Sequence, residues 1–502
     1  MALNFIFHDY ETFGKEVSGA SSQWAAITTD ADFNIKEVHD IYCKISEDVV
    51  PDPVACLITR ITPQETLEKG VCEYDFARKV NQVMTKEWES VIVGYNSIGF
   101  DDEVTRFLNY RNLIDPYKWA YDKKRSRFDA LPLMRLIHAL KPEAFKWPIV
   151  EKEGSDGVTY NRVSFKLEHL SEINGIVHEN AHNAVDDVKA LICLVKMAFE
   201  RAPEISKLYF GMKNKWEAKR FIEANDIFGL CNFRFVDTGY VSPVKRLGFS
   251  TKSQNKCWTW NLQVDPTPFS SMSDAELVNA IKMNKEEREK TGTPRSGVVS
   301  VKINEVPCIF DSNLLKGETS AHVGLQELRE QMYNNALFLD NNPEFVQRVI
   351  DIYDNREYED ETTDTDSNLY KSCGGFFTDD ENEQIKSFVS SQSWDEKLSV
   401  YNNLPEGRIK TMAFRIIGRN APETFLSDTQ LRKEWSNYVT QRFAGKTANC
   451  YLSLDDYAEQ LDGEEVEKLL QDDPKRKSTF DLLIDYKNTL LNRNKNYSTV
   501  AL

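Results

Sequence analysis

Two acidic residues near the start of the chain, Asp9 and Glu11, are separated by one residue and follow a short apolar run, Leu3 to Phe7. In an extended strand, residues i and i+2 project from the same face, so the two carboxylates should meet at one edge of a sheet. Mg²⁺ takes oxygen ligands and usually keeps several waters, which leaves room for a substrate phosphate. The pair therefore predicts a hard-cation site, although two acids at this spacing, taken alone, are more often part of a solvated turn.

A third acidic residue, Asp101, follows another apolar run, Val91 to Tyr95, after a short loop. An isolated aspartate before a helical pattern is usually an N-cap, whose carboxylate accepts hydrogen bonds from the first backbone N–H groups of the helix. Because it follows the strand carboxylates and precedes a late histidine and aspartate, Asp101 is also a candidate for a third metal ligand.

His182 and Asp187 form the late element, directly before a predicted helix, Ala184 to Arg201, whose apolar residues recur at helical spacing. Five residues on an ideal helix are about 140° apart, so these two side chains cannot share one helix face. We therefore expect His182 on the preceding loop and Asp187 in the first helical turn. Each has an ordinary alternative, because a first-turn acid stabilises the helix dipole and a loop histidine need have no task.

Regular secondary structure must position these residues. Residues 1 to about 200 alternate short apolar runs with helical patterns, as an α/β layer does. The expected strands are Leu3–Phe7, Gln23–Thr28, Val38–Lys44 and Val91–Tyr95. Residues 204–354 are richer in β-branched and aromatic residues, which predicts a small β module. Its expected elements are strands at Asn232–Val236, Cys257–Val264 and Gly297–Ile303 and a helical piece at Ser273–Thr291.

The region from Asp354 to Asp366 holds seven acids and one arginine without apolar periodicity, which predicts an exposed linker. Helices are expected beyond it, and Thr378 with Glu381 resembles a capping box that opens one of them. The further predicted helices are Lys410–Ile417, Asp428–Phe443, Ser453–Leu470 and Ser478–Leu491.

Composition limits the class of protein. A chain of 502 residues, 41% hydrophobic and 28% charged, is expected to form roughly three globular domains. Its nine cysteines form no C-x-x-C pair and are odd in number, so we predict neither a zinc site nor a disulfide framework, and a cytoplasmic location. The N-terminus has no basic region and no apolar stretch reaches about 18 residues, which predicts neither export nor membrane insertion.

The formal net charge of −17 disfavours a nucleic-acid binder if it is spread evenly, because phosphate contacts need local cations. The segment from Lys118 to Arg135 is different, with six cations against two acids. Aromatic residues are interleaved with these cations, as in a groove that follows a nucleic-acid backbone and stacks its bases. Some of them, Phe107, Tyr110 and Trp119 in particular, could equally belong to the core.

Together these elements resemble the DEDDh group of 3′ to 5′ exonucleases, through Asp9, Glu11, Asp101, and the His182 and Asp187 pair in H-x-x-x-x-D spacing. Longer motifs are similar to the bacterial exonuclease I family. They are HDYETFG at 8–14, LITRITPQE at 57–65, GYNSIGFDDEVTRF at 94–107, RNLIDPY at 111–117 and FKLEHLSEINGI at 165–176, with weaker matches at 298–307 and 374–379. The resemblance covers most of the chain and is densest over the first 200 residues.

The resemblance implies an α/β enzyme that removes 5′-mononucleotides from the 3′ end of single-stranded DNA in repair and recombination. It implies an RNase H-like exonuclease domain with a mixed central sheet at 1–200 and an SH3-like domain with a helical insertion at 204–354. An acidic linker at 355–368 and an all-α domain at 369–502 would complete a clamp around the strand. Asp9, Glu11, Asp101 and Asp187 would hold two Mg²⁺ ions, with Mn²⁺ as a substitute, and His182 would be the general base.

The resemblance also assigns contacts with single-stranded DNA, and a monomeric state. The expected substrate contacts are Glu11, Arg106, Tyr117, Tyr121, Arg135, Lys166, Asn255 and Asn304. Lys166 stands where the family usually has an arginine, so the bidentate fork is lost there while the charge is kept. The family binds the acidic tail of single-stranded-DNA-binding protein through a basic pocket, but the corresponding region, Lys316 to Phe338, keeps few cations.

Two alternatives remain open at this point. The acidic residues alone cannot distinguish DNA from RNA, so a DEDDh exoribonuclease or a proofreading exonuclease would use the same set, although the additional 300 residues argue against both. A catalytically silent DNA-binding clamp is the other alternative, and the presence of all five expected side chains disfavours it.

Overall fold

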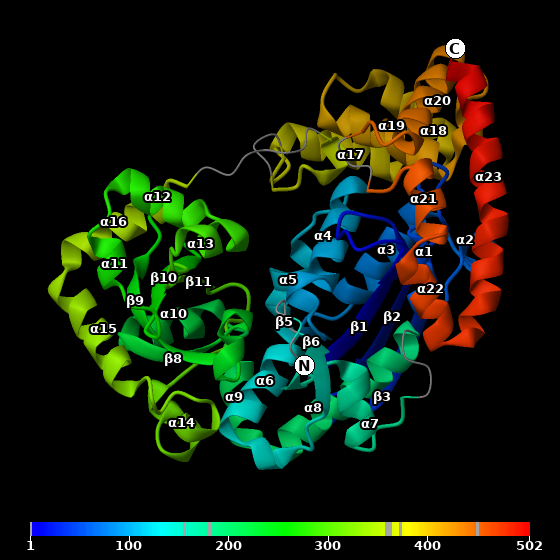
Figure 1. Ribbon diagram of the computed structural model, residues 1–502. Helices are drawn as coiled ribbons and strands as arrows, with labels where there is room; N and C mark the ends of the chain where they lie inside the picture. Colours follow the sequence, from blue (N-terminus) through cyan, green and yellow to red (C-terminus); the bar gives the residue numbers. More distant parts are fainter. Residues whose placement is uncertain are drawn as a thin grey trace. The chain divides into compact units, whose positions relative to one another are not determined.

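A computed structural model describes residues 3–153, 157, 159–178, 183–356, 364–370, 374–447 and 451–501 (Figure 1). The chain forms two compact units, each assembled from segments distant in sequence. Unit 1 contains Met1–Arg125, His178–Ala190 and Glu359–Leu502, and unit 2 contains Ser126–Val177 and Leu191–Tyr358. Helix α8 (Ala184–Arg201) therefore begins in unit 1 and ends in unit 2.

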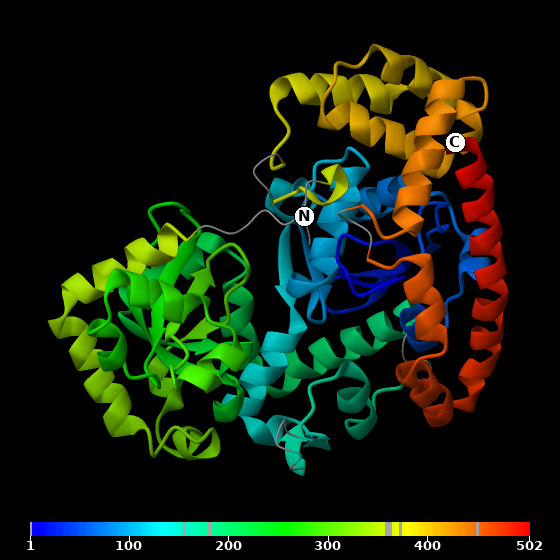
Figure 2. The same cartoon turned by 45° about the horizontal axis from the view of Figure 1, so that its top comes forward.

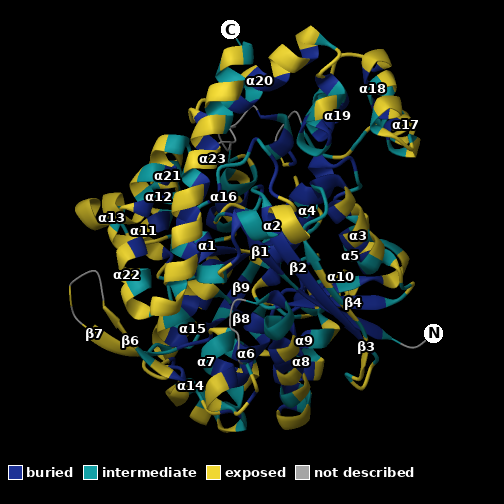
Figure 3. Cartoon of the chain, turned by 90° about the vertical axis from the view of Figure 1, so that its right-hand side faces the viewer, coloured by how far each residue is buried: buried dark blue, intermediate teal, exposed yellow. Residues whose placement is uncertain are grey.

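The sheet of unit 1 contains β1 (Asn4–Thr12), β2 (Ser21–Thr29), β3 (Ile35–Tyr42) and β4 (Ser90–Gly94), in the order β3-β2-β1-β4. Strand β1 is antiparallel to β2 and parallel to β4, so the predicted mixed sheet is confirmed. All residues of β2 and β4 are buried, and Figure 3 shows β1 and β2 mostly in the colour of buried residues. Strand β1 continues beyond the predicted Phe7, because Asp9 and Glu11 still pair with Ala25 and Gln23 of β2.

Unit 1 also contains helices from the first part of the chain. They are α1 (Pro53–Thr59), α2 (Pro63–Lys69), α3 (Glu73–Thr85), α4 (Asp101–Arg111) and α5 (Lys118–Tyr121). Phe76, Val80 and Met84 of α3 pack with Ile6 and Ile92 of the sheet. This burial of apolar side chains holds α3 on the sheet.

The C-terminal part of unit 1 is helical, as predicted. Its helices are α17 (Asp379–Ser390), α18 (Trp394–Asn403), α19 (Arg408–Asn420), α20 (Thr429–Phe443), α21 (Leu454–Leu461), α22 (Glu464–Asp472) and α23 (Lys477–Ala501). The predicted capping box is confirmed, because Thr378 and Glu381 cap each other's backbone N–H groups at the start of α17. Helix α23, red in Figure 2, contacts α1 and α2.

The single helix predicted for Ser453–Leu470 is wrong, since α21 ends at Leu461 and α22 begins after Gly463. Glycine has a low helix propensity, and here it occupies the N-cap of the second helix. Helical periodicity of the apolar residues continues across this break, which is why the pattern alone suggested one element.

The predicted exposed linker is wrong at its C-terminal end, because Asp364 and Asp366 are buried in unit 1. Arg415 pairs with both aspartates, and Arg419 donates to Asp366 at 2.6 Å and to Asp48 at 3.0 Å. These arginines hold the pKa of Asp366 far below its usual value even though burial opposes this. A run of acids thus becomes part of a buried ion cluster, and residues 357–363 of the predicted linker lie outside the described residues.

Unit 2 contains an antiparallel sheet in the order β11-β10-β9-β8-β12. Its strands are β8 (Ile227–Cys231), β9 (Val241–Phe249), β10 (Lys256–Asn261), β11 (Val298–Lys302) and β12 (Ile309–Phe310). The strand predicted for Asn232–Val236 is wrong, because Phe233–Thr238 forms a 3₁₀ helix. The Asn232 side chain accepts a hydrogen bond from the Arg234 backbone and so favours a turn over a strand.

The remaining elements of unit 2 are short strands and helices. They are β5 (Ser126–Asp129), α6 (Ala130–Leu140), β6 (Ile149–Glu153), β7 (Thr159–Val163), α7 (Leu167–Ile173), α9 (Pro203–Gly211), α10 (Lys215–Ala224), α11 (Thr267–Ser270), α12 (Asp274–Lys282), α13 (Lys285–Thr291), α14 (Glu318–His322), α15 (Arg329–Asn341) and α16 (Pro343–Asp354). The helical piece expected at Ser273–Thr291 is two helices, because Asn284 and Glu287 form a capping box that starts the second. Helices α15 and α16, which cover the Trp260 core, were not predicted.

The seven cysteines among the described residues are all free thiols. None of the helices in the described ranges is long and apolar enough to cross a membrane.

Candidate active site

The site begins with the alternation of side chains along β1. His8 and Tyr10 point into the core, where Trp24 donates a hydrogen bond to Nδ1 of His8 at 3.4 Å. Burial lowers the pKa of His8 to about 3, so its imidazole stays neutral. Asp9 and Glu11 occupy the alternate positions and therefore project from the other face of the strand.

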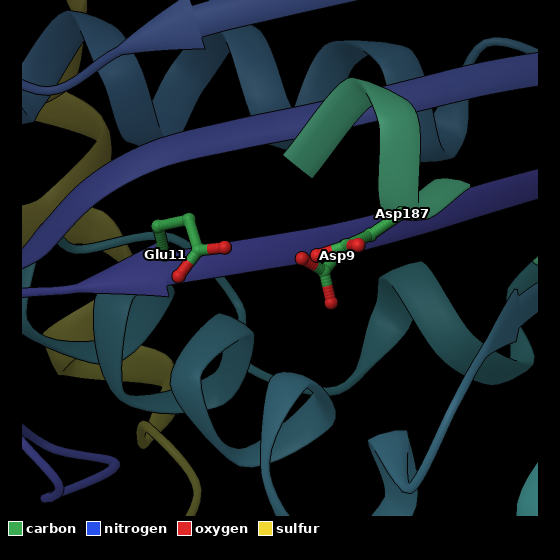
Figure 4. A group of neighbouring side chains, drawn as sticks. All are labelled: Asp9, Glu11 and Asp187. Carbon is green, nitrogen blue, oxygen red and sulfur yellow. The ribbon is translucent and has the colours of Figure 1, made fainter. Parts of the chain in front are cut away.

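Asp187 reaches the same place from the first turn of α8. Carboxylate oxygens of Asp9, Glu11 and Asp187 all lie within 4.8 Å of one another, and Figure 4 shows Asp9 and Asp187 together, with the Glu11 carboxylate on the side that faces them. The backbone N–H of Asp187 bonds to the Asn183 carbonyl, which fixes this first turn. The structure thus brings together two residues from β1 and one residue about 180 positions later.

Asp101 is held against the same strand by a backbone contact. Its Oδ1 accepts a hydrogen bond at 3.1 Å from the backbone N–H of Tyr10, the residue between Asp9 and Glu11. The N-cap of α4 is Phe100, so the alternative that Asp101 is an ordinary N-cap does not hold. Asp101 therefore lies beside the carboxylates, although it is outside the group within 4.8 Å.

The electrostatics of this cluster favour a bound cation. The pKa of Asp9 is raised well above its usual value by burial first and then by the negative charges of Asp101, Glu11 and Asp187. The pKa of Glu11 is raised by burial, Asp187 and Asp101. Within the described residues, neither Asp9 nor Glu11 has a lysine or arginine at ion-pair distance. An all-oxygen donor set whose charges repel one another fits Mg²⁺ or another hard divalent ion.

Replacing Asp9 with asparagine should raise the melting temperature of the metal-free protein by a few degrees at about pH 8. The pKa of Asp9 is higher in the folded than in the unfolded state, so stability falls as the pH rises above the unfolded value near 4. Asparagine removes this loss, and the two proteins should melt alike near pH 3, where this carboxyl group is largely protonated in both states. Thermal melting in EDTA across this pH range measures the effect, and equal melting temperatures at about pH 8 would contradict it.

His182, the predicted general base, lies outside the described residues. A second histidine of the same segment, His178, lies directly beside the site, because its Nε2 contacts Oδ1 of Asp187 and its side chain is only 6% exposed. His178 was not predicted from the sequence, because the motif rests on the five-residue spacing from His182 to Asp187 alone. Its position four residues before His182 was the available signal.

Arg106, Tyr117 and Tyr121, three of the predicted DNA contacts, lie in unit 1. The Arg106 guanidinium pairs with Glu103 and donates to the Tyr370 hydroxyl at 3.0 Å. Arg106 and Asp101 share α4, about 7.5 Å apart along its axis. Tyr121 is exposed, so its ring is accessible to a base.

Two aromatic residues from the C-terminal segment extend this surface. The Phe376 ring lies 5.0 Å from Tyr117, and Tyr370 packs edge-on against Phe107 at 5.8 Å. Tyr370 is 53% exposed and Phe376 is 73% exposed. Neither was predicted as a DNA contact from the sequence, although Phe376 belongs to the family motif at 374–379. Exposed rings beside an arginine are suited to base stacking.

The basic segment from Lys118 to Arg135 is only partly available for binding. Arg125 is buried and donates to the backbone carbonyls of Lys118 and Trp119, while Trp119 itself is fully buried. Tyr110 and Phe107 are also buried, so the core alternative holds for these three aromatic residues.

Of the other predicted contacts, all but Glu11 lie in unit 2. Asn255 and Asn304 are neighbours, because the Ile303 backbone N–H bonds to the Asn255 carbonyl and Arg127 donates to the Asn304 carbonyl at 2.9 Å. Lys166 is exposed and pairs with Glu168. Arg135 stacks on the Tyr240 ring, 4.3 Å from its centroid.

Comparison with known families agrees with this site. The chain matches the family described as exonuclease over residues 6–195, the exonuclease I SH3-like domain over 231–355 and the exonuclease I C-terminal domain over 363–490. It is 32% identical over 475 residues to exodeoxyribonuclease I of Escherichia coli K12, covering 91% of this chain and 92% of the relative. It is 30% identical over 480 residues to that of Haemophilus influenzae, covering 93% and 97%.

Solved structures are similar along almost the whole chain. Escherichia coli exonuclease I in complex with a 5cy-dT13 oligonucleotide has a TM-score of 0.84 at 30% identity, covering 98% of this chain and 100% of that chain. A zinc-bound complex of the same enzyme with single-stranded DNA has a TM-score of 0.83 at 30% identity, covering 97% and 99%. An ExoI/SSB-Ct complex has a TM-score of 0.83 at 29% identity, covering 98% and 100%.

Proposed function

Because this chain belongs to the exonuclease I family, we propose that it is an exodeoxyribonuclease that removes 5′-mononucleotides from the 3′ end of single-stranded DNA, in DNA repair and recombination. The observation that supports this most directly is the group of carboxylates from Asp9, Glu11 and Asp187 within 4.8 Å, with Asp101 held beside it. A site of this kind suits phosphodiester hydrolysis, in which negative charge develops on the attacking and leaving oxygens.

The chain's own residues have distinct tasks in this proposal. Asp9, Glu11, Asp101 and Asp187 would hold two Mg²⁺ ions, with Mn²⁺ as a substitute, and bound ions would stabilise the charge that develops on the phosphate. Asp101 also positions β1, because it accepts the Tyr10 N–H between the two strand ligands. His182 would take the proton from the attacking water, since an imidazole with a pKa near 6.5 can act as a base at neutral pH.

Binding of the strand is proposed for aromatic and polar residues. Tyr117, Tyr121 and the newly identified Tyr370 and Phe376 would stack bases, with Arg106 close to them. Glu11 and Lys166 would contact the terminal nucleotide, and Arg135, Asn255 and Asn304 would contact the strand from unit 2. We further propose a cytoplasmic monomer with domains at 1–200, 204–354 and 369–502 and a linker at 355–368.

An acidic C-terminal tail of single-stranded-DNA-binding protein is the proposed protein partner, on the basis of the similar ExoI/SSB-Ct complex. The region from Lys316 to Phe338 keeps two lysine or arginine residues, Lys316 and Arg329, so we expect weak binding. Fluorescence anisotropy with a labelled tail peptide measures it.

An assay of nucleotide release tests the proposed function. Single-stranded DNA labelled at its 5′ end should shorten by one nucleotide at a time with Mg²⁺ or Mn²⁺, and remain intact in EDTA. Duplex DNA and RNA of matched sequence should be degraded much more slowly. Equal degradation of RNA would favour the exoribonuclease alternative. If no nucleotide is released with any divalent ion, the alternative of a catalytically silent DNA-binding clamp would be favoured.

A further inference from the structure

The hairpin formed by β6 and β7 in unit 2 separates charge between its two faces. Tyr160 pairs with Lys152 and Arg162 pairs with Val150, so these four residues project from one face. Glu151 and Glu153 alternate with them and project from the other face. Tyr160 is 47% exposed, and Figure 3 shows the strands of this hairpin in the colour of exposed residues. One face therefore carries two cations and an aromatic ring, and the opposite face carries the acids.

The basic face is anchored to the rest of unit 2 through Tyr240. Arg162 bonds to the Tyr240 hydroxyl, and its guanidinium carbon lies 5.4 Å from the centre of the Tyr240 ring. Arg135 from α6 lies over the same ring at 4.3 Å. Neither arginine has an acidic side chain within ion-pair distance among the described residues. Both guanidinium groups thus contact the same tyrosine, and neither pairs with an acidic side chain of the described residues.

This arrangement leaves hydrogen-bond donors available for an anion. A guanidinium that stacks on an aromatic ring keeps its in-plane N–H groups, and a planar fork of donors fits a phosphate. Two like charges near one ring repel each other, and a bound phosphate would relieve this repulsion.

We propose that this surface, Arg135, Lys152, Tyr160 and Arg162, binds single-stranded DNA. The three cations would contact backbone phosphates, and Tyr160 would stack on a base. The inference rests on the proposed function and adds a binding site that the sequence analysis did not assign, since of the four residues only Arg135 was an expected contact. Alternation of cations with an exposed ring favours a single strand over an acidic peptide, because only the nucleic acid offers both phosphates and bases.

A charge-removing pair of substitutions, K152Q/R162Q, tests the proposal on the full-length protein. Binding of a dT oligonucleotide of about 30 residues is measured in EDTA by fluorescence anisotropy over a range of salt concentrations. Loss of two phosphate contacts should reduce the slope of log K against log salt by about 1.4 and weaken binding about tenfold at low salt. A matched control, E151Q/E153Q, alters the opposite face of the same hairpin and should bind at least as tightly as the parent.

Two further measurements distinguish a failure of this inference from a failure of the proposed function and from misfolding of the variant. Release of a mononucleotide from a dT trinucleotide with Mg²⁺ is measured for the parent and for E151Q/E153Q, and equal rates in these two proteins support the proposed function independently of the basic face. The variant K152Q/Y160A leaves Arg162 on Tyr240 and should also weaken binding about tenfold, through loss of one phosphate contact and one stacked base. Parent-like affinity and salt slope in both variants would overturn the proposal, as would an equal loss in E151Q/E153Q.

Discussion

Replacing Asp187 with asparagine should reduce the rate of DNA hydrolysis by about 10³-fold or more and leave single-stranded DNA binding within about twofold of the parent. Asp187 completes the carboxylate group of Asp9 and Glu11, and metal-dependent stabilisation of the transition state is worth several kcal/mol, with about 1.4 kcal/mol for each tenfold. The variant removes one negative charge from the ion site without altering the aromatic residues proposed to hold the strand. Single-turnover release of mononucleotides at saturating Mg²⁺, together with anisotropy in EDTA, measures both quantities.

The adjacent residue provides the control for this experiment. Asp186 lies in the same helical turn but pairs with Lys189, so D186N changes the same charge outside the carboxylate group. It should keep hydrolysis within a few-fold of the parent. Full activity in D187N, or equal losses in D187N and D186N, would contradict the assignment of Asp187 to the metal site.

The second large effect is expected for His182. At saturating Mg²⁺ and about pH 8, H182A should hydrolyse DNA about 10²- to 10⁴-fold more slowly, the usual contribution of a general base. The parent rate should rise with pH through the ordinary histidine pKa near 6.5, because only the neutral imidazole can accept a proton. H182A should lose this rise of the rate with pH. A substitution that affected only the structure of the site would lower the rate but keep the rise.

His178 is the natural comparison, because it belongs to the same segment and contacts Asp187. If His178 only orients that carboxylate, H178A should slow hydrolysis about 10- to 100-fold and keep the rising limb of the pH profile. If H178A lost the rise of the rate with pH and H182A kept it, His178 would be the general base and the assignment of His182 would be refuted.

Several structural elements were predictable because they depend on local patterns. The strands of unit 1 follow from short apolar runs, and the start of α17 from a capping box that is complete within four residues. Two of the errors have equally local causes, and the third depends on residues distant in sequence. Asn232 favours a 3₁₀ turn, Gly463 separates α21 from α22, and the acids at 364 and 366 are buried only because Arg415 and Arg419 face them.

The amino-acid sequence by itself determined which residue types could do the chemistry and their order along the chain. It also determined that Asp9 and Glu11 share a face, since alternation in a strand is a property of the local backbone. Only the tertiary structure decided that Asp187 meets them, that Asp101 bonds to β1 instead of capping its helix, and that His178 lies beside Asp187. The physical reason is that contacts between distant segments depend on how helices pack on the sheet, and spacing along the chain does not specify that packing.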